Sequence, residues 1–351
     1  MRKATIIALV VIAGLAGLTF AQQNAANAEV EVLHVRGPIY MLAGAGGNIT
    51  VSVGPDGVLM VDTGLAQNAD KVLAAVRNLQ KQMATNGMPA WSWGAETRSN
   101  LNAMISPDAP PKPIRYIINT HVLTDHTGGN EKLGLAGETI TGGNAAGSIR
   151  DAGKGASIIA HENVLNRMSA ADGNQPAATF RALPTDTYHM KRMNLSHFFN
   201  GEGVQIIAEP FAHTDGDSIV VFRYSDVIAT GDIFVQTTYP IIDLARGGGI
   251  EGEIAALNHI LEISVPEFRT EGGTMVVPGH GRLSDSADVA YYRDMVTIIR
   301  DRVQDMIRKG MTVEQVKAAK PTRDYDPRYG ATTGFWTTDM FVEAVFKSLK
   351  K

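Results

Sequence analysis

Two histidines and an aspartate lie close together in residues 115–130, where their side chains could hold a metal ion. They are His121, Asp125 and His126. They follow the apolar run at residues 114–118, which is typical of a short buried strand. Imidazole and carboxylate groups are common ligands of zinc, and Gly128 and Gly129 then allow a sharp turn into a helix. Alone, the cluster fits a metal site and a polar loop that happens to contain two histidines equally well.

The same arrangement recurs at four other places, where an apolar run ends in a small residue and then an Asp or His. The side chains at these ends are Asp62, His213, Asp232 and His280. In layered α/β proteins, sites assemble where strand carboxyl ends meet. We therefore expect five strand ends to converge on one pocket. Asp62 is expected either to hydrogen-bond a metal ligand or to fix its own turn.

Short apolar or alternating runs predict the strands that must position these side chains. They cover residues 30–35, 39–42, 48–53, 58–61, 114–118, 204–208 and 218–222. Apolar residues at helical spacing predict helices at residues 67–83, 251–263, 289–307 and 337–349. Residues 84–113 are expected to form a polar insertion away from the metals, and residues 169–200 to be irregular. His161 is expected to cap a helix or to pack in the core.

Together these residues resemble the metallo-β-lactamase superfamily. Its hallmark is His-x-His-x-Asp-His, followed by a separate His, a separate Asp and a final His. The chain carries, in that order, His121, Asp125, His126, His213, Asp232 and His280. The hallmark's second His falls at Leu123, which is the one departure. The resemblance implies an α/β fold, the four-layer αββα sandwich, with extra C-terminal helices.

The resemblance also sorts the expected ligands into two subsites. The first subsite has His121, His213 and Asp232, and the second has Asp125, His126, Asp232 and His280. Asp232 takes the place of a carboxylate that bridges two metals. Because Leu123 cannot coordinate, the first subsite should hold its ion more weakly. We expect two zinc ions, or a single zinc in the second subsite.

This ligand set predicts hydrolytic chemistry. Zinc lowers the pKa of bound water to roughly 7, and three or four protein ligands leave a position open for water or substrate. We therefore predict a zinc-dependent hydrolase that uses metal-bound hydroxide on an ester, thioester, lactone or β-lactam. Asp125 is expected both to bind metal and to orient the hydroxide. The substrate itself cannot be named from the sequence.

Two alternatives stay open. His121, His213 and Asp232 form a two-His, one-carboxylate set that suits mononuclear Fe(II) and oxygen chemistry, similar to the sulfur dioxygenases of the same superfamily. Loss of the hallmark His at Leu123 would also fit a degenerate, non-catalytic metal-binding protein. Iron content with oxygen consumption identifies the first alternative. Leu123→His tests the second, because it should tighten metal binding in the first subsite.

Composition limits the partners. The 351 residues include no cysteine and carry a formal net charge of −4. The absence of cysteine excludes disulfides, thiolate ligands and a Cys nucleophile. Nothing in the sequence shows the basic footprint of a nucleic-acid-binding protein, so a small-molecule substrate is the expected partner. The sequence does not indicate an oligomeric state.

Residues 1–28 are typical of a bacterial secretory signal peptide. A short basic start is followed by an apolar run at residues 6–20, and small-residue cleavage patterns end at Ala21 and Ala28. Its removal would leave 30 basic and 36 acidic residues, a net charge of −6. We expect a periplasmic or secreted protein without stable membrane insertion; the alternative is an uncleaved N-terminal anchor. The predicted domain covers residues 29–285, with a helical extension at residues 286–351 packed on it.

Overall fold

The computed structural model describes residues 29–86, 112–139, 154–171, 176–195, 197–265 and 272–350. The predicted signal peptide and its cleavage points lie outside these residues, as does most of the predicted insertion, at residues 87–111. Within the described ranges, no helix combines the length and apolar character needed to cross a membrane.

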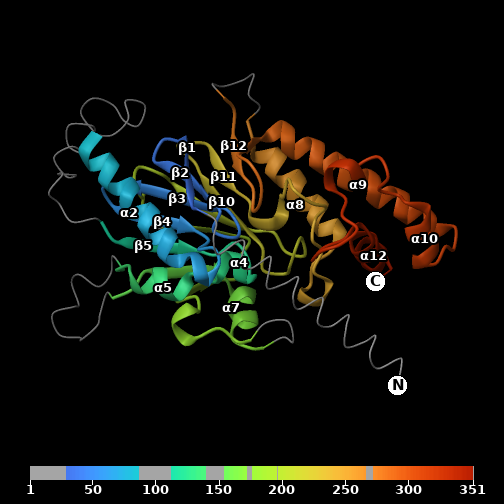
Figure 1. Ribbon diagram of the computed structural model, residues 1–351, viewed down its shortest axis with the longest axis horizontal. Helices are drawn as coiled ribbons and strands as arrows, with labels where there is room; N and C mark the ends of the chain where they lie inside the picture. Colours follow the sequence, from blue (N-terminus) through green and yellow to red (C-terminus); the bar gives the residue numbers. More distant parts are fainter. Residues whose placement is uncertain are drawn as a thin grey trace.

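Two β-sheets form the centre of the fold (Figure 1). The first has seven strands, which run in sequence order across the sheet: β1 (Glu31–Arg36), β2 (Ile39–Ala43), β3 (Ile49–Gly54), β4 (Gly57–Val61), β5 (Ile114–Ile118), β6 (Ser157–His161) and β7 (Asp186–Tyr188). The second has six, in the order β13 (Ser284–Asp285), β12 (Met275–Val277), β11 (Val227–Ala229), β10 (Ser218–Phe222), β9 (Val204–Ala208) and β8 (Arg192–Asn194).

The central strands of each sheet are buried on both faces. Successive residues of a strand point to opposite sides, so each strand contributes to two cores. In β4, Met60 packs with the helices that cover the first sheet, whereas Leu59 packs toward the second sheet. In β10, Val220 packs toward the first sheet, whereas Ile219 packs with the C-terminal helices. The apolar strands therefore produce three stacked cores.

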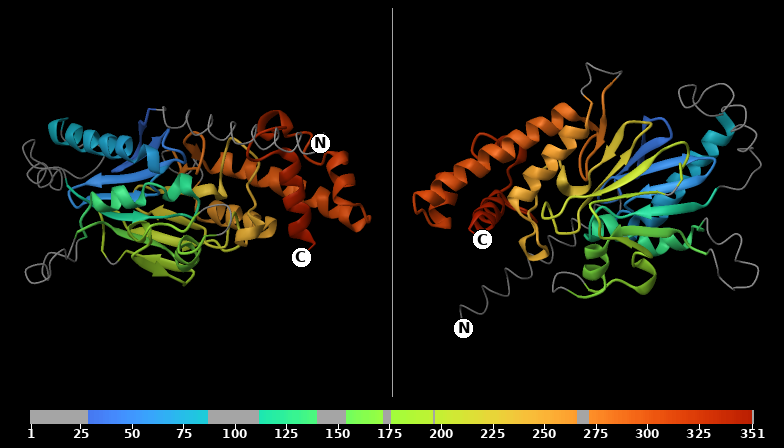
Figure 2. Two further views of the ribbon diagram at one scale, coloured as in Figure 1. Left: turned by 60° about the horizontal axis from the view of Figure 1, so that its bottom comes forward. Right: turned by 180° about the vertical axis from the view of Figure 1, so that it is seen from behind.

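Helices cover the outer faces of the two sheets (Figure 2). On the first sheet lie α2 (Ala69–Asn86) and α5 (Asn130–Leu135). On the second lie α8 (Ile250–Ile263), α9 (Ser286–Arg308) and α12 (Thr338–Leu349). The shorter helices are α4 (Thr124–Thr127), α7 (Glu162–Met168), α10 (Val313–Ala319) and α11 (Asp326–Tyr329). The predicted four-layer αββα sandwich with extra C-terminal helices is confirmed.

Parallel pairing sends several strand ends to the same edge. Strands β4, β5, β6 and β7 are parallel neighbours, and β11 is parallel to β12. The turns that leave these strands therefore meet at one side of the sandwich, as is usual for sites in layered α/β proteins.

The prediction that residues 169–200 are irregular is wrong in part. They include β7, β8 and a short 3-10 helix, η2 (Phe180–Ala182). Both strands are three residues long and lie at the edges of their sheets. Edge strands are often short and polar, so this segment lacks the apolar alternation that identifies a longer buried strand.

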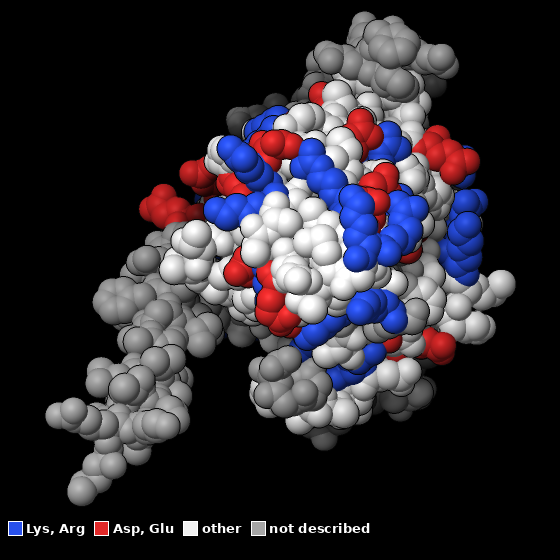
Figure 3. Space-filling view, turned by 90° about the vertical axis from the view of Figure 1, so that its right-hand side faces the viewer, with Lys and Arg blue, Asp and Glu red and all other residues white. Residues whose placement is uncertain are grey.

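The C-terminal helices share the core of the second sheet. Tyr292 of α9 and Phe341 of α12 are buried in the same cluster as Ile228 and Val276 of the sheet. At their surface, Lys and Arg lie next to Asp and Glu (Figure 3). The ion pairs there include Arg302–Asp324, Lys317–Glu343 and Arg300–Glu251. Such exposed pairs contribute little stability individually, so apolar packing holds these helices in place.

Candidate metal centre

All six predicted metal ligands lie at the same edge of the sandwich. They occupy the turn after β5 (His121), helix α4 (Asp125 and His126), the turn between β9 and β10 (His213), the 3-10 helix η3 (Gly231–Ile233) after β11 (Asp232), and the turn after β12 (His280). Their donor atoms form two groups, within each of which all atoms lie within 4.8 Å of one another. These groups have the composition predicted for the first and second subsites.

Asp232 belongs to both groups. Its Oδ2 is 3.8 Å from His121 Nε2, and its Oδ1 is 3.1 Å from His126 Nε2. Its two oxygens thus face different subsites. The second group is completed by His280, whose Nε2 is 3.1 Å from Asp125 Oδ2. The arrangement suits one carboxylate shared by two cations.

The three buried imidazoles are oriented through their Nδ1 atoms. These atoms contact Asp62 Oδ2 (His126, 2.7 Å), the backbone oxygen of Ile241 (His213, 2.7 Å) and Thr120 Oγ1 (His121, 3.0 Å). Each Nε2 is left for the centre of the cluster. Metal-binding histidines commonly have this arrangement, because the outer contact fixes the tautomer and the ring plane.

Asp62 contacts a candidate ligand and holds the turn that leaves the neighbouring strand β5. Besides His126, its carboxylate accepts hydrogen bonds from Thr120 N (2.8 Å) and Thr120 Oγ1 (2.7 Å). Its backbone is left-handed, with φ 66°, a conformation that Asp adopts more readily than most residues. The ends of β4 and β5 are thereby joined directly behind the cluster.

Burial leaves polar atoms of the cluster without partners. His121, His126 and His213 are 0% exposed, and Asp232 is 2% exposed. Within the described residues, no hydrogen-bond partner reaches His121 Nε2 or His213 Nε2. Unpartnered buried polar atoms carry a large desolvation cost. A cation coordinated by these atoms would offset it, so the residues present fit a metal ion.

The pKa shifts suit a cation at His121 and at the two carboxylates. At His126 and His280 burial opposes protonation, but nearby carboxylates, above all Asp232, outweigh burial and raise the pKa, so a bound metal would have to displace their protons. Burial and the neighbouring His126 hold the pKa of His121 well below its ordinary value of 6.5. Burial opposes ionisation of Asp125, yet His126 and His280 hold the pKa of Asp125 at about 2. Burial likewise opposes ionisation of Asp232, but these same two imidazoles hold its pKa well below the ordinary value. A neutral imidazole and ionised carboxylates are the forms that bind metals.

Comparison with known proteins identifies the family. The family model described as the metallo-beta-lactamase superfamily matches residues 43–280. The chain belongs to this superfamily. Its fold is that of metal-dependent hydrolases, and the His and Asp cluster lies where that fold can hold metal. No match was found among curated protein sequences.

Solved structures of the superfamily share the fold at low identity. The stereoselective inverting sec-alkylsulfatase Pisa1 from Pseudomonas sp. has a TM-score of 0.54 and 16% identity, covering 92% of this chain and 51% of the sulfatase. This chain thus spans about half of that protein's length. A metallo-β-lactamase from Pontibacter korlensis has a TM-score of 0.49 and 12% identity, covering 77% of this chain and 99% of that one. At these identities the likeness shows the fold alone.

Leu123 stands where the sequence resemblance places a second histidine. It directly precedes α4 and is half-buried against an apolar cluster that includes Val164 and Met168 of α7. A leucine supplies no donor atom. The first subsite therefore has its three donors and no fourth from this position.

The sequence interpretation missed the supports supplied by Gly47 and Asn48. Gly47 N donates to the backbone oxygen of Asp125 (3.0 Å), and a Cβ at Gly47 would lie 2.4 Å from His126 Nε2. Asn48 Nδ2 donates to the backbone oxygens of Pro278 (2.9 Å) and Gly281 (3.0 Å), on either side of His280. The signal was the pair Gly46 and Gly47 between two predicted strands, followed by Asn48 at the start of the second.

Two histidines outside the superfamily pattern have structural contacts. His161 Nδ1 accepts a hydrogen bond from Asn163 N at 3.2 Å and caps α7, as expected. His259 is half-buried in α8 and pairs with Glu209. Neither belongs to the two donor groups.

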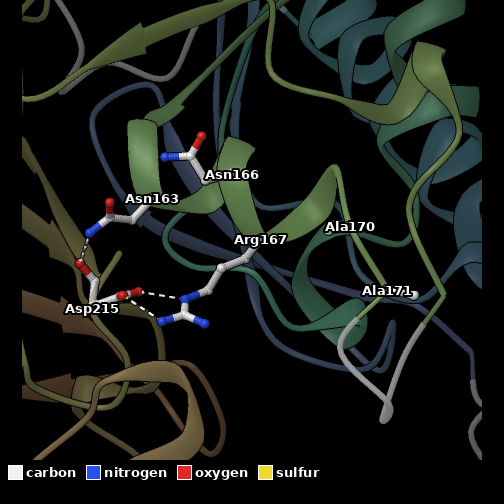
Figure 4. Close-up of a pocket in the computed structure, with 6 residues that line it drawn as sticks. All are labelled: Asn163, Asn166, Arg167, Ala170, Ala171 and Asp215. Carbon is white, nitrogen blue, oxygen red and sulfur yellow. Dashed lines mark hydrogen bonds and ion pairs between the residues drawn. The ribbon is translucent and has the colours of Figure 1, made fainter.

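A cavity of about 300 Å³ lies beside α7 (Figure 4). Its lining residues are Asn163, Asn166, Arg167, Ala170, Ala171 and Asp215. Arg167 donates from Nε and Nη2 to the two carboxylate oxygens of Asp215, at 2.8 and 2.6 Å. Because Asp215 follows His213 by two residues, this ion pair joins α7 to the turn that carries His213. None of the lining residues is a candidate metal ligand.

Proposed function

We propose that this protein is an exported zinc-dependent hydrolase acting on an ester, thioester, lactone or β-lactam. The observation that carries the proposal is the pair of donor groups that share Asp232. Their inward-facing imidazoles have their outer nitrogens already engaged. A polar loop with incidental histidines would have no need of this orientation.

We assign His121, His213 and Asp232 to the first subsite, and Asp125, His126, Asp232 and His280 to the second. Bound zinc would make a coordinated water acidic enough to act as a nucleophile at neutral pH and would polarise a carbonyl. The chain's own part is orientation. Asp62, Thr120 and the Ile241 carbonyl hold the imidazoles, and such outer contacts sustain metal affinity.

Asp125 is the residue we assign to catalysis. Its side chain is 32% exposed and that of His280 is 30% exposed, whereas the other four candidate ligands are buried. Substrate would therefore approach from the side of Asp125 and His280. There the Asp125 carboxylate can accept a hydrogen bond from the attacking water and orient it toward the substrate.

Export is part of the proposal because of the first 28 residues. Their basic start, apolar run and small-residue cleavage patterns are those of a secretory signal peptide. A periplasmic or secreted location would suit a small-molecule substrate from outside the cytoplasm. N-terminal sequencing of the protein recovered from the periplasm and medium of a bacterial host tests this part separately.

A mononuclear Fe(II) oxygenase is the second candidate. His121, His213 and Asp232 come together as a group of their own, and two histidines with one carboxylate are the usual ligands of such iron centres. Oxygen consumption by protein containing one iron would favour this function over hydrolysis.

Elemental analysis of the purified mature protein, prepared without added metal, is the deciding experiment. One or two zinc ions per chain support the hydrolase. The protein would then be assayed on β-lactams, lactones, thioesters, carboxylic esters and a secondary alkyl sulfate, since the sulfatase shares the fold. Failure to bind zinc even when it is supplied would rule out the proposed function and leave a non-catalytic protein on this fold.

A further inference from the structure

The carbonyl that orients His213 belongs to residues 238–242, and this segment is bound by the C-terminal helices. Ile241 O accepts the hydrogen bond from His213 Nδ1 at 2.7 Å. The next contact along the segment returns to the same turn, because Asp243 N donates to His213 O at 3.0 Å. The position of His213 therefore depends on where this segment lies.

Three hydrogen-bonding side chains connect the segment to the C-terminal part of the chain. They are Tyr292 (Oη to Thr238 O, 3.2 Å), Trp336 (Nε1 to Pro240 O, 3.1 Å) and Tyr239 itself (Oη to Thr322 O, 3.1 Å, and to Asp326 Oδ1, 2.9 Å). The Tyr239 ring also stacks on Phe341 of α12, with centroids 4.7 Å apart. We call these contacts the C-terminal brace.

Every C-terminal partner in the brace lies outside residues 43–280, which match the superfamily. Tyr239 and Tyr292 are each 1% exposed, so these contacts are made inside the core rather than at the surface. A buried tyrosine hydroxyl needs a partner, which limits how far the segment can move. The brace is therefore supplied from beyond the residues that the family model matches.

The first subsite has particular need of such a support. With Leu123 in place of a histidine, only His121, His213 and Asp232 can hold an ion there. Loss of orientation in one of three ligands weakens binding more than loss in one of four. The second subsite has supports of its own, in Asp62, Gly47 and Asn48.

We propose that the C-terminal brace positions His213 for the first subsite and compensates for the histidine missing at position 123. This inference rests on the proposed metal binding at that subsite. Residues Tyr292 and Trp336 are positioning residues, which act through the Ile241 carbonyl and touch no donor atom of the cluster.

The test compares Zn²⁺ affinities of the two subsites in the full mature chain. The double variant Tyr292→Phe/Trp336→Phe removes both donors, keeps the ring at position 292 and leaves a smaller aromatic ring at position 336. Tyr291→Phe is the matched control, because Tyr291 is 50% exposed on the same helix. Competition with a chromophoric chelator gives each affinity. The variants His213→Ala and His280→Ala assign the affinities to the subsites.

We expect the double variant to weaken Zn²⁺ binding at the first subsite about tenfold, the lower end of what loss of an outer contact costs a metal site. The Zn²⁺ affinity of the second subsite in the double variant should change less than about twofold, and so should both affinities in the Tyr291→Phe control, well below the loss of an outer contact. Thermal unfolding of the metal-free variants verifies that they fold. Equal losses at both subsites, or unchanged affinities in a folded double variant, would overturn the inference.

A second arm uses Leu123→His. Restoring the fourth ligand should increase the Zn²⁺ affinity of the first subsite and make the brace dispensable. In this background the two Phe substitutions should lower that affinity by less than about threefold, which is well below the usual contribution of an outer contact. The same tenfold loss in this background would show that the brace does not compensate for Leu123. A wild-type protein with one Zn²⁺, in the second subsite, would overturn the brace but spare the hydrolase. No bound Zn²⁺ would overturn both.

Discussion

The candidate metal ligands that follow the two sheets are brought together in different ways. Those that follow the first sheet come from one six-residue segment, residues 121–126. Those that follow the second sheet come from three separate strand ends, at residues 213, 232 and 280. Side chains of neighbouring strands orient the first set, whereas His213 is oriented by the Ile241 backbone carbonyl.

This difference shows where the site is vulnerable. The first set depends on a short motif and on Asp62, so the changes that damage it lie close to it. The second set depends on close packing between segments that are far apart in the sequence, so substitutions well outside the cluster should affect it. Four substitutions test this comparison.

The largest effect is expected from Asp232→Ala, which removes the donor shared by both subsites. Loss of an outer contact typically costs a metal site roughly 10–100-fold in affinity, and loss of a shared ligand should exceed about 100-fold at each subsite. Equilibrium dialysis with Zn²⁺ measures it. Asp305→Ala, which alters an exposed pair with Lys309, is the control. A variant that keeps one subsite intact would show that Asp232 is not shared.

Gly248→Ala should damage only the second-sheet set. A Cβ at Gly248 would lie 2.1 Å from His213 O, and a backbone oxygen cannot give way as a flexible side chain can. We expect the first subsite to lose roughly 10–100-fold in Zn²⁺ affinity, as for a displaced outer contact.

Gly249→Ala is the matched control for this prediction. Its backbone is extended, and its nearest neighbour is Ser348 Oγ at 3.2 Å. The Zn²⁺ affinity of the Gly249→Ala variant at the first subsite should stay within about twofold of wild type, a much smaller change than the loss of an outer contact causes. Similar affinities for Gly248→Ala and Gly249→Ala would remove the proposed role of close packing around His213.

Asp62→Asn tests the first-sheet set. Asn tolerates the left-handed backbone at this position, so the turn should persist while His126 loses its carboxylate partner. We expect about a tenfold loss of Zn²⁺ affinity at the second subsite, with the first subsite much less affected. Competition with a chelator measures both affinities, and a larger loss at the first subsite would contradict the comparison.

The smallest effect on metal binding, but a clear one on stability, is expected from Glu253→Gln in α8. Glu253 is fully buried, and neither carboxylate oxygen has a partner within the described residues. Burial, together with Asp217 and Asp232, raises the pKa of Glu253 well above 4.5. The folded protein therefore keeps it protonated at pH values where the unfolded chain releases the proton.

The raised pKa of Glu253 makes the free energy of unfolding depend on pH. A raised pKa in the folded state contributes stability below pH 4.5 that is lost as pH rises toward the folded pKa. Glu253→Gln should remove this loss and stabilise the protein by about 1–3 kcal/mol at pH 8, with little change near pH 4.5. Urea unfolding of the metal-free proteins at several pH values measures the difference. If the gain in free energy of unfolding did not grow with pH, the raised pKa of Glu253 would be contradicted.

The sequence predicted much of this fold because its strands are strongly apolar. Strands β9 and β10 match the predicted residues 204–208 and 218–222 at both ends. The three-residue edge strands β7 and β8 were missed, because so short a polar segment has no periodicity. The predicted helix at residues 289–307 corresponds to α9, which begins three residues earlier at Ser286, where Asp285 caps it.

The donor set was predictable, but its supports were only partly so. A motif of His and Asp after a strand can be recognised from residue types alone. The roles of three other residues cannot be recognised in this way. Ile241 acts through its backbone carbonyl, Gly248 through the absence of a side chain, and Trp336 through a contact with a residue 96 positions away in the sequence. Such relationships appear only when the chain is folded.

In the proposed metal site, the exposure of Asp125 and His280 would govern how quickly ions exchange. An ion in the second subsite would face solvent, whereas an ion held by His121 and His213 would lie behind side chains that are 0% exposed. We expect a chelator to remove the better-coordinated ion first, because access rather than affinity limits its rate. Residence time and binding strength would then rank the two ions in opposite orders, and a partly stripped sample would retain the more weakly bound one.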